Sequence, residues 1–485
     1  MTTRLPSRLA LTAAAALLIP AAAVAAEPAI DRYDLGQRLV LVERAWASQH
    51  DAAARGRAVP VLKQAVPQFL ANKNVEAAET LDRARLLLRS ADPSPADRWA
   101  AALLVHPATR LLDPAHGSLA VHVLSAYPAG SPPAGAVLRL ALVGASGAAP
   151  FAAAEVPLAA LPAAATLPTD KLPEGDHTLR AEVVVGGQVL ATYTAGVSAV
   201  PRLAKRIGSI HTAAGKALDR STDSATLQSL AVLLEELYRR NSPETNYPAA
   251  RLVAEAEALA RARAAKEEFY GPKRTGQFWL TLPANKDGVP VRLFVPEQAR
   301  AGKPLPLVVA LHGAGGSENL FFDAYGSGLI ARLAAERGWL VVAPRAGWLF
   351  DGPPPVAAIV DELAKLYPVD QKRVYVVGHS MGAMQSVAVA QDTPGRFAAI
   401  APLGGGGTVR KPEVFAELPV FVGYGTEDFL AGGERGLAAA LRESGAKKLT
   451  VKEYAGVEHI LVVQEALPDV FRFFEKAGSG SERRR

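Results

Sequence analysis

The 485-residue sequence contains no cysteine. This absence excludes disulfide bonds, thiol catalysis, cysteine-bound metals and a lipid-modified leader. The net charge is small, because the formal value of +6 falls to +1 without two arginines near the amino terminus and three at the end of the chain. A nearly neutral body has no electrostatic reason to bind nucleic acid. After the first 26 residues no apolar run is long enough to cross a bilayer.

Those first 26 residues have the pattern of a secretory signal peptide. Arg4 and Arg8 precede an alanine-rich apolar run. Pro20 interrupts this run, which makes a retained membrane anchor the weaker interpretation. We therefore expect cleavage near Ala25 or Ala26, export to the periplasm or the extracellular space, and no stable membrane span in the mature chain.

Hydrophobic periodicity divides the rest of the chain into further segments. Apolar residues recur at helical spacing, give way to short strands of period two, return to helical spacing, and finally alternate between strands and helices. The Gly186-Gly187 pair between two strand patterns predicts a tight hairpin. The expected segments are a helical region at 27–112, an immunoglobulin-like β-sandwich at 117–200, a helical region at 201–268, an α/β domain at 271–478 and a disordered tail at 479–485. The sequence leaves open whether the two helical regions pack on each other.

The strands of the last domain are nearly continuous apolar runs. Examples are "PLVVALHG", "RVYVVGHS" and "PVFVGYG". Runs of this kind are typical of strands that are buried on both faces of a sheet. Because helical segments separate most of them, we expect a mostly parallel sheet that is covered by helices.

One of these strands leads directly into the pattern G-x-S-x-G around Ser380. Composition alone would produce this pattern about 0.2 times in such a chain, so the context has to decide. A compact apolar strand ends at Gly378, and a helix-forming segment follows Ser380. Strand, sharp turn and helix is the arrangement of a nucleophile elbow, in which Gly378 and Gly382 are required because side chains there would collide with the strand and the helix. Ser380 is therefore the candidate nucleophile.

A serine nucleophile needs a base and an acid that orients the base. In an elbow of this kind they follow in the order serine, acid, histidine. His459, just after the strand "LTVKEYA", is the one histidine beyond residue 428. The strand "PVFVGYG" is followed by Glu427 and Asp428. Asp428 closes a G-x-x-D turn and is the preferred acid, with Glu427 as the alternative.

The tetrahedral intermediate of such a reaction needs two N–H donors for its oxyanion. The backbone of Met381, directly after the nucleophile, is one candidate. The glycine-rich loop "LHGAGGSEN" supplies the other from Ala314, with Gly315 as the alternative. In the same loop, His312 is expected to order the backbone. His379 is expected to pack beside the sheet with its side chain away from the nucleophile.

The segment "VDQKRVYVVGHSMGAMQSVAVAQDTPGRFAAIAPLGGG", with "LHGAGG" before it and "GTED" and "EHI" after it, resembles the α/β-hydrolase serine esterases. The similar group includes secreted polyhydroxybutyrate depolymerase-like and feruloyl or acetylxylan esterase-like proteins, and it is related to predicted peptidases of the prolyl-oligopeptidase-like type. The resemblance runs from Gly271 to Lys476. It implies an α/β-hydrolase fold, with Ser380 as nucleophile, Asp428 as acid and His459 as base.

The expected function is therefore that of an exported serine hydrolase that cleaves small or polymer-attached carboxylic esters through an acyl-enzyme. This chemistry needs no metal and no organic cofactor. Trp348 and Phe350 are expected either to line the substrate pocket or to cover the sheet edge. Two alternatives stay open. One is a serine peptidase of the prolyl-oligopeptidase-like type, and the other is an exported binding protein whose hydrolase domain is catalytically idle.

Overall fold

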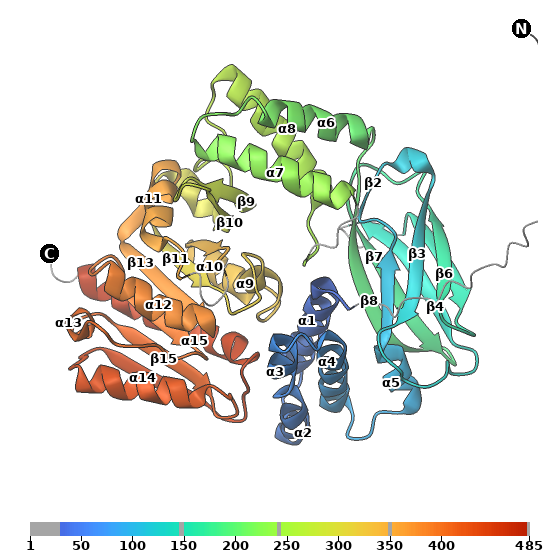
Figure 1. Cartoon of the computed structure of the whole chain (residues 1–485), viewed down its shortest axis with the longest axis horizontal. Helices are drawn as coiled ribbons and strands as arrows, with labels where there is room; N and C mark the ends of the chain where they lie inside the picture. The colour runs from blue at the N-terminus through green and yellow to red at the C-terminus, as the bar shows by residue number, and fades with distance from the viewer. Residues whose placement is uncertain (1–29, 145–149, 240–243, 348–351, 483–485) are drawn as a thin grey trace, which may run out of the picture.

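A computed structural model describes residues 30–144, 150–239, 244–347 and 352–482. The expected signal peptide lies outside these residues. Four parts are arranged as a closed ring in Figure 1: an amino-terminal helical bundle, a β-sandwich, three further helices and an α/β domain. The bundle returns to the α/β domain, so that segments from opposite ends of the chain lie side by side.

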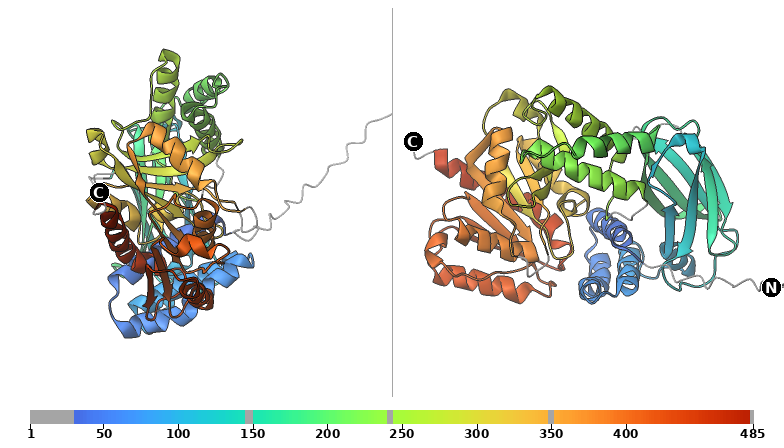
Figure 2. Two further views of the ribbon diagram at one scale, coloured as in Figure 1. Left: turned by 90° about the vertical axis from the view of Figure 1, so that its left-hand side faces the viewer. Right: turned by 45° about the horizontal axis from the view of Figure 1, so that its top comes forward.

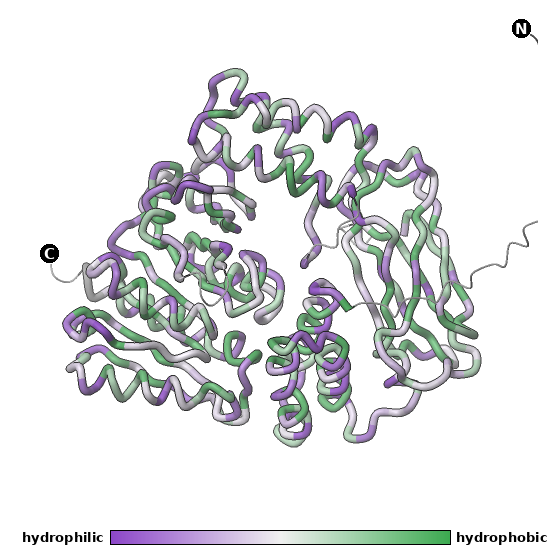
Figure 3. The backbone as a smooth tube through the Cα atoms, in the orientation of Figure 1, coloured by the Kyte–Doolittle hydropathy of each residue, from purple (hydrophilic) through white to green (hydrophobic). Residues whose placement is uncertain are grey.

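The amino-terminal bundle consists of amphipathic helices with polar caps. Asp31 begins the first helix as part of a capping box with Asp34, and Asp51 and Ser94 cap two others through side-chain oxygens. Along these helices the tube in Figure 3 changes between hydrophilic and hydrophobic colours from turn to turn, as one-sided burial requires. The helices are α1 (Arg32–Ser48), α2 (Ala52–Leu62), α3 (Ala65–Leu70), α4 (Asn74–Arg89) and α5 (Pro95–Ala101).

Two sheets then face each other around one apolar core. One has the order β1-β3-β6 and the other β2-β8-β7-β4-β5. With β3 as strand B, the first order corresponds to the A-B-E sheet of immunoglobulin-type sandwiches, and β8-β7-β4-β5 corresponds to the G-F-C-C′ sheet, to which β2 adds a short parallel edge strand. The strands are β1 (Leu103–Pro107), β2 (Leu111–Leu112), β3 (Ser118–Ser125), β4 (Val137–Gly144), β5 (Ala152–Pro157), β6 (Ala163–Pro168), β7 (Gly175–Val185) and β8 (Gln188–Ala199), with a 3₁₀ turn η1 (Pro114–His116).

The boundary expected at residue 112 is wrong. The segment 103–112, assigned to the helical region, forms β1 and β2, because its residues pair with β3 and with the last strand of the sandwich. The hairpin at Gly186-Gly187 is present, with φ of 57° and 82° at its two glycines, as a primed two-residue turn needs.

Three helices connect the sandwich to the α/β domain, as the right-hand view of Figure 2 shows. They are α6 (Leu203–Ala214), α7 (Thr222–Tyr238) and α8 (Ala249–Ala265). Their apolar faces share a core with one face of the α/β sheet. The amino-terminal bundle shares a core with the opposite face. The two helical regions therefore belong to different cores and do not form one bundle.

The α/β domain is built on an eight-stranded sheet of order β16-β15-β14-β13-β11-β12-β10-β9. From β11 to β16 all neighbours run parallel, and β10 is antiparallel to both of its neighbours. The strands are β9 (Gly276–Leu282), β10 (Val289–Val295), β11 (Leu305–Leu311), β12 (Leu340–Pro344), β13 (Val369–His379), β14 (Ala399–Leu403), β15 (Val420–Gly425) and β16 (Leu449–Tyr454). The helical segments are η2 (Glu297–Ala301), α9 (Leu320–Asp323), α10 (Leu329–Arg337), α11 (Val356–Leu366), α12 (Met381–Asp392), α13 (Pro412–Phe415), α14 (Ala431–Glu443) and α15 (Val462–Glu482).

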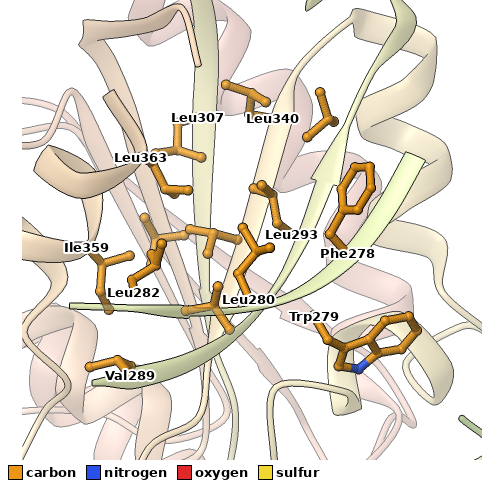
Figure 4. Packing of buried hydrophobic residues seen from close by; sticks show 14 of the residues in the cluster. Phe278, Trp279, Leu280, Leu282, Val289, Leu293, Leu307, Leu340, Ile359 and Leu363 are labelled. Atoms are coloured by element: carbon orange, nitrogen blue, oxygen red, sulfur yellow. The ribbon is translucent and has the colours of Figure 1, made fainter. Parts of the chain in front are cut away.

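Strand β11 shows how the sheet separates two cores. Leu307 and Val309 point to the side of α11 and α12, whereas Val308 and Ala310 point to the side of α10 and α15. All four are completely buried, as the continuous apolar pattern predicted. Figure 4 shows the first core close by, where leucines of β9 and β10 meet Ile359 and Leu363 of α11.

The last helix is longer than expected. Residues 479–482, assigned to a disordered tail, continue α15, because each added residue extends an existing helix by one hydrogen bond without a new nucleus. The side chain of Ser479 donates to the carbonyl of Glu475. Throughout the described part of the chain, no helix has the length and apolarity needed to cross a membrane.

Candidate active site

Ser380 stands between the end of β13 and the start of α12 in a backbone conformation that a serine rarely adopts, with φ 56° and ψ −116°. The neighbouring glycines make this turn possible. A Cβ at Gly378 would lie 2.0 Å from the carbonyl oxygen of Gly382, and a Cβ at Gly382 would lie 2.0 Å from that of Leu311. The steric reason given for both glycines at the sequence level is therefore visible in the geometry.

A further glycine that the sequence analysis did not single out also contacts the elbow. A Cβ at Gly405 would lie 2.0 Å from the carbonyl oxygen of Ser380. The backbone N–H of Ser380 in turn donates to the carbonyl of Leu403, at 2.9 Å. The run of four glycines directly after β14 was the available signal, because glycine permits a close backbone approach.

His459 and Asp428 form a buried hydrogen-bonded pair. The Nδ1 atom of His459 lies 2.9 Å and 3.0 Å from the two carboxylate oxygens of Asp428. Since the carboxylate accepts, Nδ1 carries the proton and Nε2 is left as the acceptor, which is the tautomer that a general base needs. Glu427, the alternative acid, instead pairs with Lys63 of the bundle at 3.1 Å on the surface.

Ser380 and His459 line the same cavity. In the part of the chain that the structure describes, no hydrogen bond joins the two side chains. Contacts of this kind often tighten only when a substrate is bound. The structure thus brings the three expected residues to one place, and their catalytic roles stay a prediction.

The loop after β11 reaches the elbow from the other side. A Cβ at Gly313 would lie 3.2 Å from the Cβ of Ser380. His312 orders this loop: its Nε2 accepts from the N–H of Ala346 at 3.0 Å, and its Nδ1 donates to the carbonyl of Gly313 at 2.8 Å. Burial lowers the pKa of His312, which keeps the ring neutral in this position. Ala314 follows on the cavity wall.

The other expected oxyanion donor is the N–H of Met381, the first residue of α12. The first N–H groups of a helix have no partner within the helix, and the helix dipole favours negative charge at this end. Met381 directly follows Ser380 and Ala314 lines the same cavity, and their roles as oxyanion donors stay a prediction.

His379 is buried behind the elbow and supports the base. Its Nε2 donates to the backbone carbonyl of His459 at 3.0 Å, and its Nδ1 accepts from the hydroxyl of Tyr325 at 2.6 Å. Burial, and to a smaller extent the neighbouring His459, lowers the pKa of His379 well below its ordinary value. A neutral His379 thus positions the loop that carries His459.

The cavity at Ser380 has a volume of about 430 Å³, and two parts of the chain enclose it. The α/β domain contributes the elbow, the loop after β11 and His459. The bundle contributes an apolar surface, which we call the helical wall, from residues of α1 and α3. The helical wall consists of Leu35, Leu39, Val66, Phe69 and Leu70. The sequence analysis assigned these residues to the helical region at 27–112 and did not connect them to the site.

Two aromatic residues that were considered for the pocket, Trp348 and Phe350, lie outside the described residues. Another aromatic residue, Phe429, lines the cavity, and its ring centroid lies 4.6 Å from that of His459. Phe429 is 47% exposed, which is unusual for phenylalanine. Phe429 directly follows Asp428, so its position next to the acid was the available signal.

Three buried carboxyl groups surround the site without belonging to the expected triad. Burial raises the pKa of Glu458 to about 7 and the pKa values of Glu43 and Glu434 to about 8. The Glu458 carboxylate accepts from the N–H groups of Ile460 and Leu461, which holds the turn that carries His459. Among the described residues, no three histidine, cysteine, aspartate or glutamate side chains are grouped so that they could hold a metal ion.

Residues 306–449 match the family model described as alpha/beta hydrolase fold. Within the chain, 131 residues are 31% identical to the "Bifunctional acetylxylan esterase/xylanase XynS20E" of Neocallimastix patriciarum, which is 25% of this chain and 19% of that protein. Another 142-residue match is 33% identical to the "Putative esterase NocK" of Nocardia uniformis subsp. tsuyamanensis, covering 26% of this chain and 40% of that protein. The chain thus spans less than half the length of these relatives.

Among solved structures, one described as a thermostable esterase aligns over 74% of this chain and 95% of its own, at 17% identity and a TM-score of 0.38. The family match lies within the eight-stranded sheet, from β11 to the start of β16. The strand order and the elbow between β13 and α12 agree with that match. The carboxyl-terminal part of this chain therefore has the α/β-hydrolase fold that its sequence predicted.

Proposed function

We propose that this protein is a serine hydrolase that cleaves carboxylic esters with Ser380 as nucleophile, His459 as base and Asp428 as orienting acid. The observation that carries the proposal is the paired Asp428 carboxylate on Nδ1 of His459, in one cavity with a serine held in an elbow. The names of the two matched relatives, both of which include esterase, support the same class of reaction.

In the first half of the reaction, the hydroxyl oxygen of Ser380 attacks the carbonyl carbon of the ester while Nε2 of His459 takes its proton. Asp428 stabilises the imidazolium that forms. The backbone N–H groups of Met381 and Ala314 receive the negative charge that develops on the carbonyl oxygen. When the tetrahedral intermediate collapses, His459 returns the proton to the departing alcohol, and the acyl group stays on Ser380.

In the second half, His459 takes a proton from water, and the resulting hydroxide attacks the acyl carbon. The bond to Ser380 breaks, its oxygen regains the proton from His459, and the carboxylic acid leaves. Each step uses side chains and backbone groups of this chain. The buried pair of His459 and Asp428 keeps the base in one tautomer through both halves.

The test is hydrolysis of p-nitrophenyl esters from acetate to octanoate by the mature protein and by Ser380→Ala. We expect kcat to fall by roughly 10⁴- to 10⁶-fold in the variant, because the nucleophile and its base act as a unit. Ser386→Ala is a matched control, since Ser386 is buried in α12 and its hydroxyl donates to the carbonyl of Ala383, its one partner among the described residues. Equal turnover by Ser380→Ala and the wild type would refute the assignment.

We also propose that the protein is exported, on the strength of the leader pattern in its first 26 residues. Amino-terminal sequencing of the protein from the periplasm or the culture medium tests this. A mature chain that begins near Glu27 is the expected result, and a chain retained in the cytoplasm with its leader intact contradicts it.

A further inference from the structure

The amino-terminal bundle reaches directly into the candidate active site. In Figure 1, α1 and α3 lie beside the α/β domain near α9 and α15. The helical wall faces the same cavity as Ser380 and His459, together with Phe429 of the α/β domain. In this cavity an ester group at Ser380 therefore has apolar side chains from the far amino-terminal end of the chain as neighbours.

Phe69 contacts the loop that carries the expected oxyanion donor. A Cβ at Gly315 would lie 2.5 Å from Cε1 of the Phe69 ring, so the ring packs against a backbone that only glycine allows. Gly315 has φ +75° and directly follows Ala314, the expected oxyanion donor. Arg32 of α1 adds a second contact by donating to the carbonyl of Gly315. The bundle thus contacts the loop that would hold the substrate oxygen.

The bundle is held in place by buried contacts as well as surface ones. Its apolar residues share one core with α10 and α15 of the α/β domain. Between the bundle and the α/β domain, the indole N–H of Trp46 donates to Glu465 at 2.7 Å, and the N–H of Gly326 donates to the buried Glu43 at 3.0 Å. A shared close-packed core resists deformation, so the helical wall has a defined position opposite Ser380.

We propose that the helical wall determines the substrate specificity of this enzyme, with Phe69 as its main specificity-determining residue, and that the substrates are compact esters with an apolar acyl or alcohol group. This inference rests on the proposed function. The cavity volume of about 430 Å³ lies at the lower end of the range of roughly 300–1,000 Å³ for small-molecule sites. An apolar wall matches an alkyl chain or an aromatic ring and has few groups for the hydroxyls of a polysaccharide.

The experiment compares the wild type with Phe69→Ala and with Val75→Ala. Val75 is a half-exposed apolar residue of the same bundle that does not line the cavity. Two ester series separate the two sides of the substrate: p-nitrophenyl esters of acids from acetate to octanoate, and acetate esters of alcohols from ethanol to octanol. We expect Phe69→Ala to raise the ratio of kcat/KM for the longest ester to that for the shortest by roughly tenfold in one of the two series. The physical reason is that room for one or two methylene groups in a hydrophobic pocket changes kcat/KM by about tenfold.

The series that shifts identifies whether the helical wall receives the acyl or the alcohol group. Phe69→Leu is included in case Phe69→Ala does not fold, and a smaller shift in the same direction is expected. Val75→Ala should leave the profile unchanged. Profiles of folded Phe69→Ala and Phe69→Leu that match the wild type in both series would overturn the proposal.

A binding measurement keeps this test independent of turnover. Calorimetry with p-nitrophenyl ethyl ether and p-nitrophenyl octyl ether, which have no ester bond, measures binding in the cavity without cleavage. The octyl-to-ethyl affinity ratio should increase in Phe69→Ala and stay constant in Val75→Ala. If this ratio shifts while no ester is cleaved, the proposed function fails and the role of the helical wall in binding stands. If esters are cleaved and the ratio is constant, the wall proposal fails alone.

Discussion

The two sides of the cavity are built in different ways. The α/β domain places Ser380, Asp428 and His459 just beyond the ends of β13, β15 and β16, where parallel strands bring their carboxyl ends to one edge. The helical wall comes from α1 and α3, which meet that edge only because the ring of four parts closes. The first side follows from the order of elements in one domain, whereas the second follows from packing between domains.

This difference concerns the kind of interaction involved. The elbow depends on steric rules at single positions and on directional hydrogen bonds, so a change at one residue has a large effect. The helical wall depends on apolar contacts, which are non-directional and individually small. Changes on the first side are therefore expected to abolish a reaction or a fold, and changes on the second side to shift a preference.

After the nucleophile itself, the largest effect is expected at the acid. Asp428→Asn keeps the size of the side chain but presents an amide to His459 and favours the wrong tautomer, so kcat for ester hydrolysis should fall by roughly 10⁴-fold. Glu427→Gln is the matched control, because Glu427 pairs with Lys63 on the surface. Steady-state kinetics with p-nitrophenyl acetate measures both. If Glu427→Gln lost most of its activity while Asp428→Asn stayed active, Glu427 would be the orienting acid in place of Asp428.

The next effect concerns the fold of the elbow. Gly382→Ala would place a Cβ 2.0 Å from the carbonyl oxygen of Leu311, so we expect the free energy of unfolding to fall by roughly 3–5 kcal/mol. Gly436→Ala, within α14, meets no atom within 4 Å and should stabilise the helix by roughly 0.5–1 kcal/mol. Urea unfolding of both variants tests whether their free energies of unfolding change in opposite directions. A neutral Gly382→Ala would show that the elbow relaxes.

The smallest effect concerns the junction of the bundle and the α/β domain. Burial raises the pKa of Glu43 from its ordinary 4.5 to about 8. Between pH 4.5 and about pH 8, the Glu43 carboxyl therefore stays protonated in the folded protein, whereas it is ionised in the unfolded chain. The contribution of Glu43 to the free energy of unfolding is therefore fully present below pH 4.5, and it decreases as the pH rises towards 8.

Glu43→Gln removes this titration while keeping an oxygen that can accept from Gly326. Relative to the wild type, its free energy of unfolding should be higher at pH 8 than at pH 5 by roughly 1–3 kcal/mol. Glu79→Gln, at an exposed position of α4, should show no such change between the two pH values. Urea unfolding at both pH values provides the measurement. The same pH dependence in Glu43→Gln and in the wild type would contradict the effect.

Much of the α/β domain could be predicted from the sequence. Continuous apolar strands, helical separators and the glycines around Ser380 each follow a local rule, and the structure has them where the pattern placed them. The segment 103–112 was assigned wrongly, because its strands exist only through pairing with residues further along the chain. Residues 479–482 were assigned wrongly because a well-packed helix can continue through a glycine-rich end.

The junction of the parts had no local signal of this kind. Asn246 accepts from the hydroxyl of Tyr33 in the bundle and from the N–H of Gly196 in the sandwich, and the neighbouring Thr245 donates to Asp323 in the α/β domain. One short connection thus joins three parts of the ring. These are ordinary polar residues in a loop, and only their partners give them this role.

The sequence by itself determined the elbow, the order of serine, acid and histidine, and the sheet that brings them to one edge, because these depend on steric limits and on periodicity within a single stretch of chain. Tertiary structure alone decided that the two helical regions belong to different cores and that α1 and α3 complete the cavity. Apolar side chains pack on any complementary apolar surface, so their pattern says that they are buried but not against what.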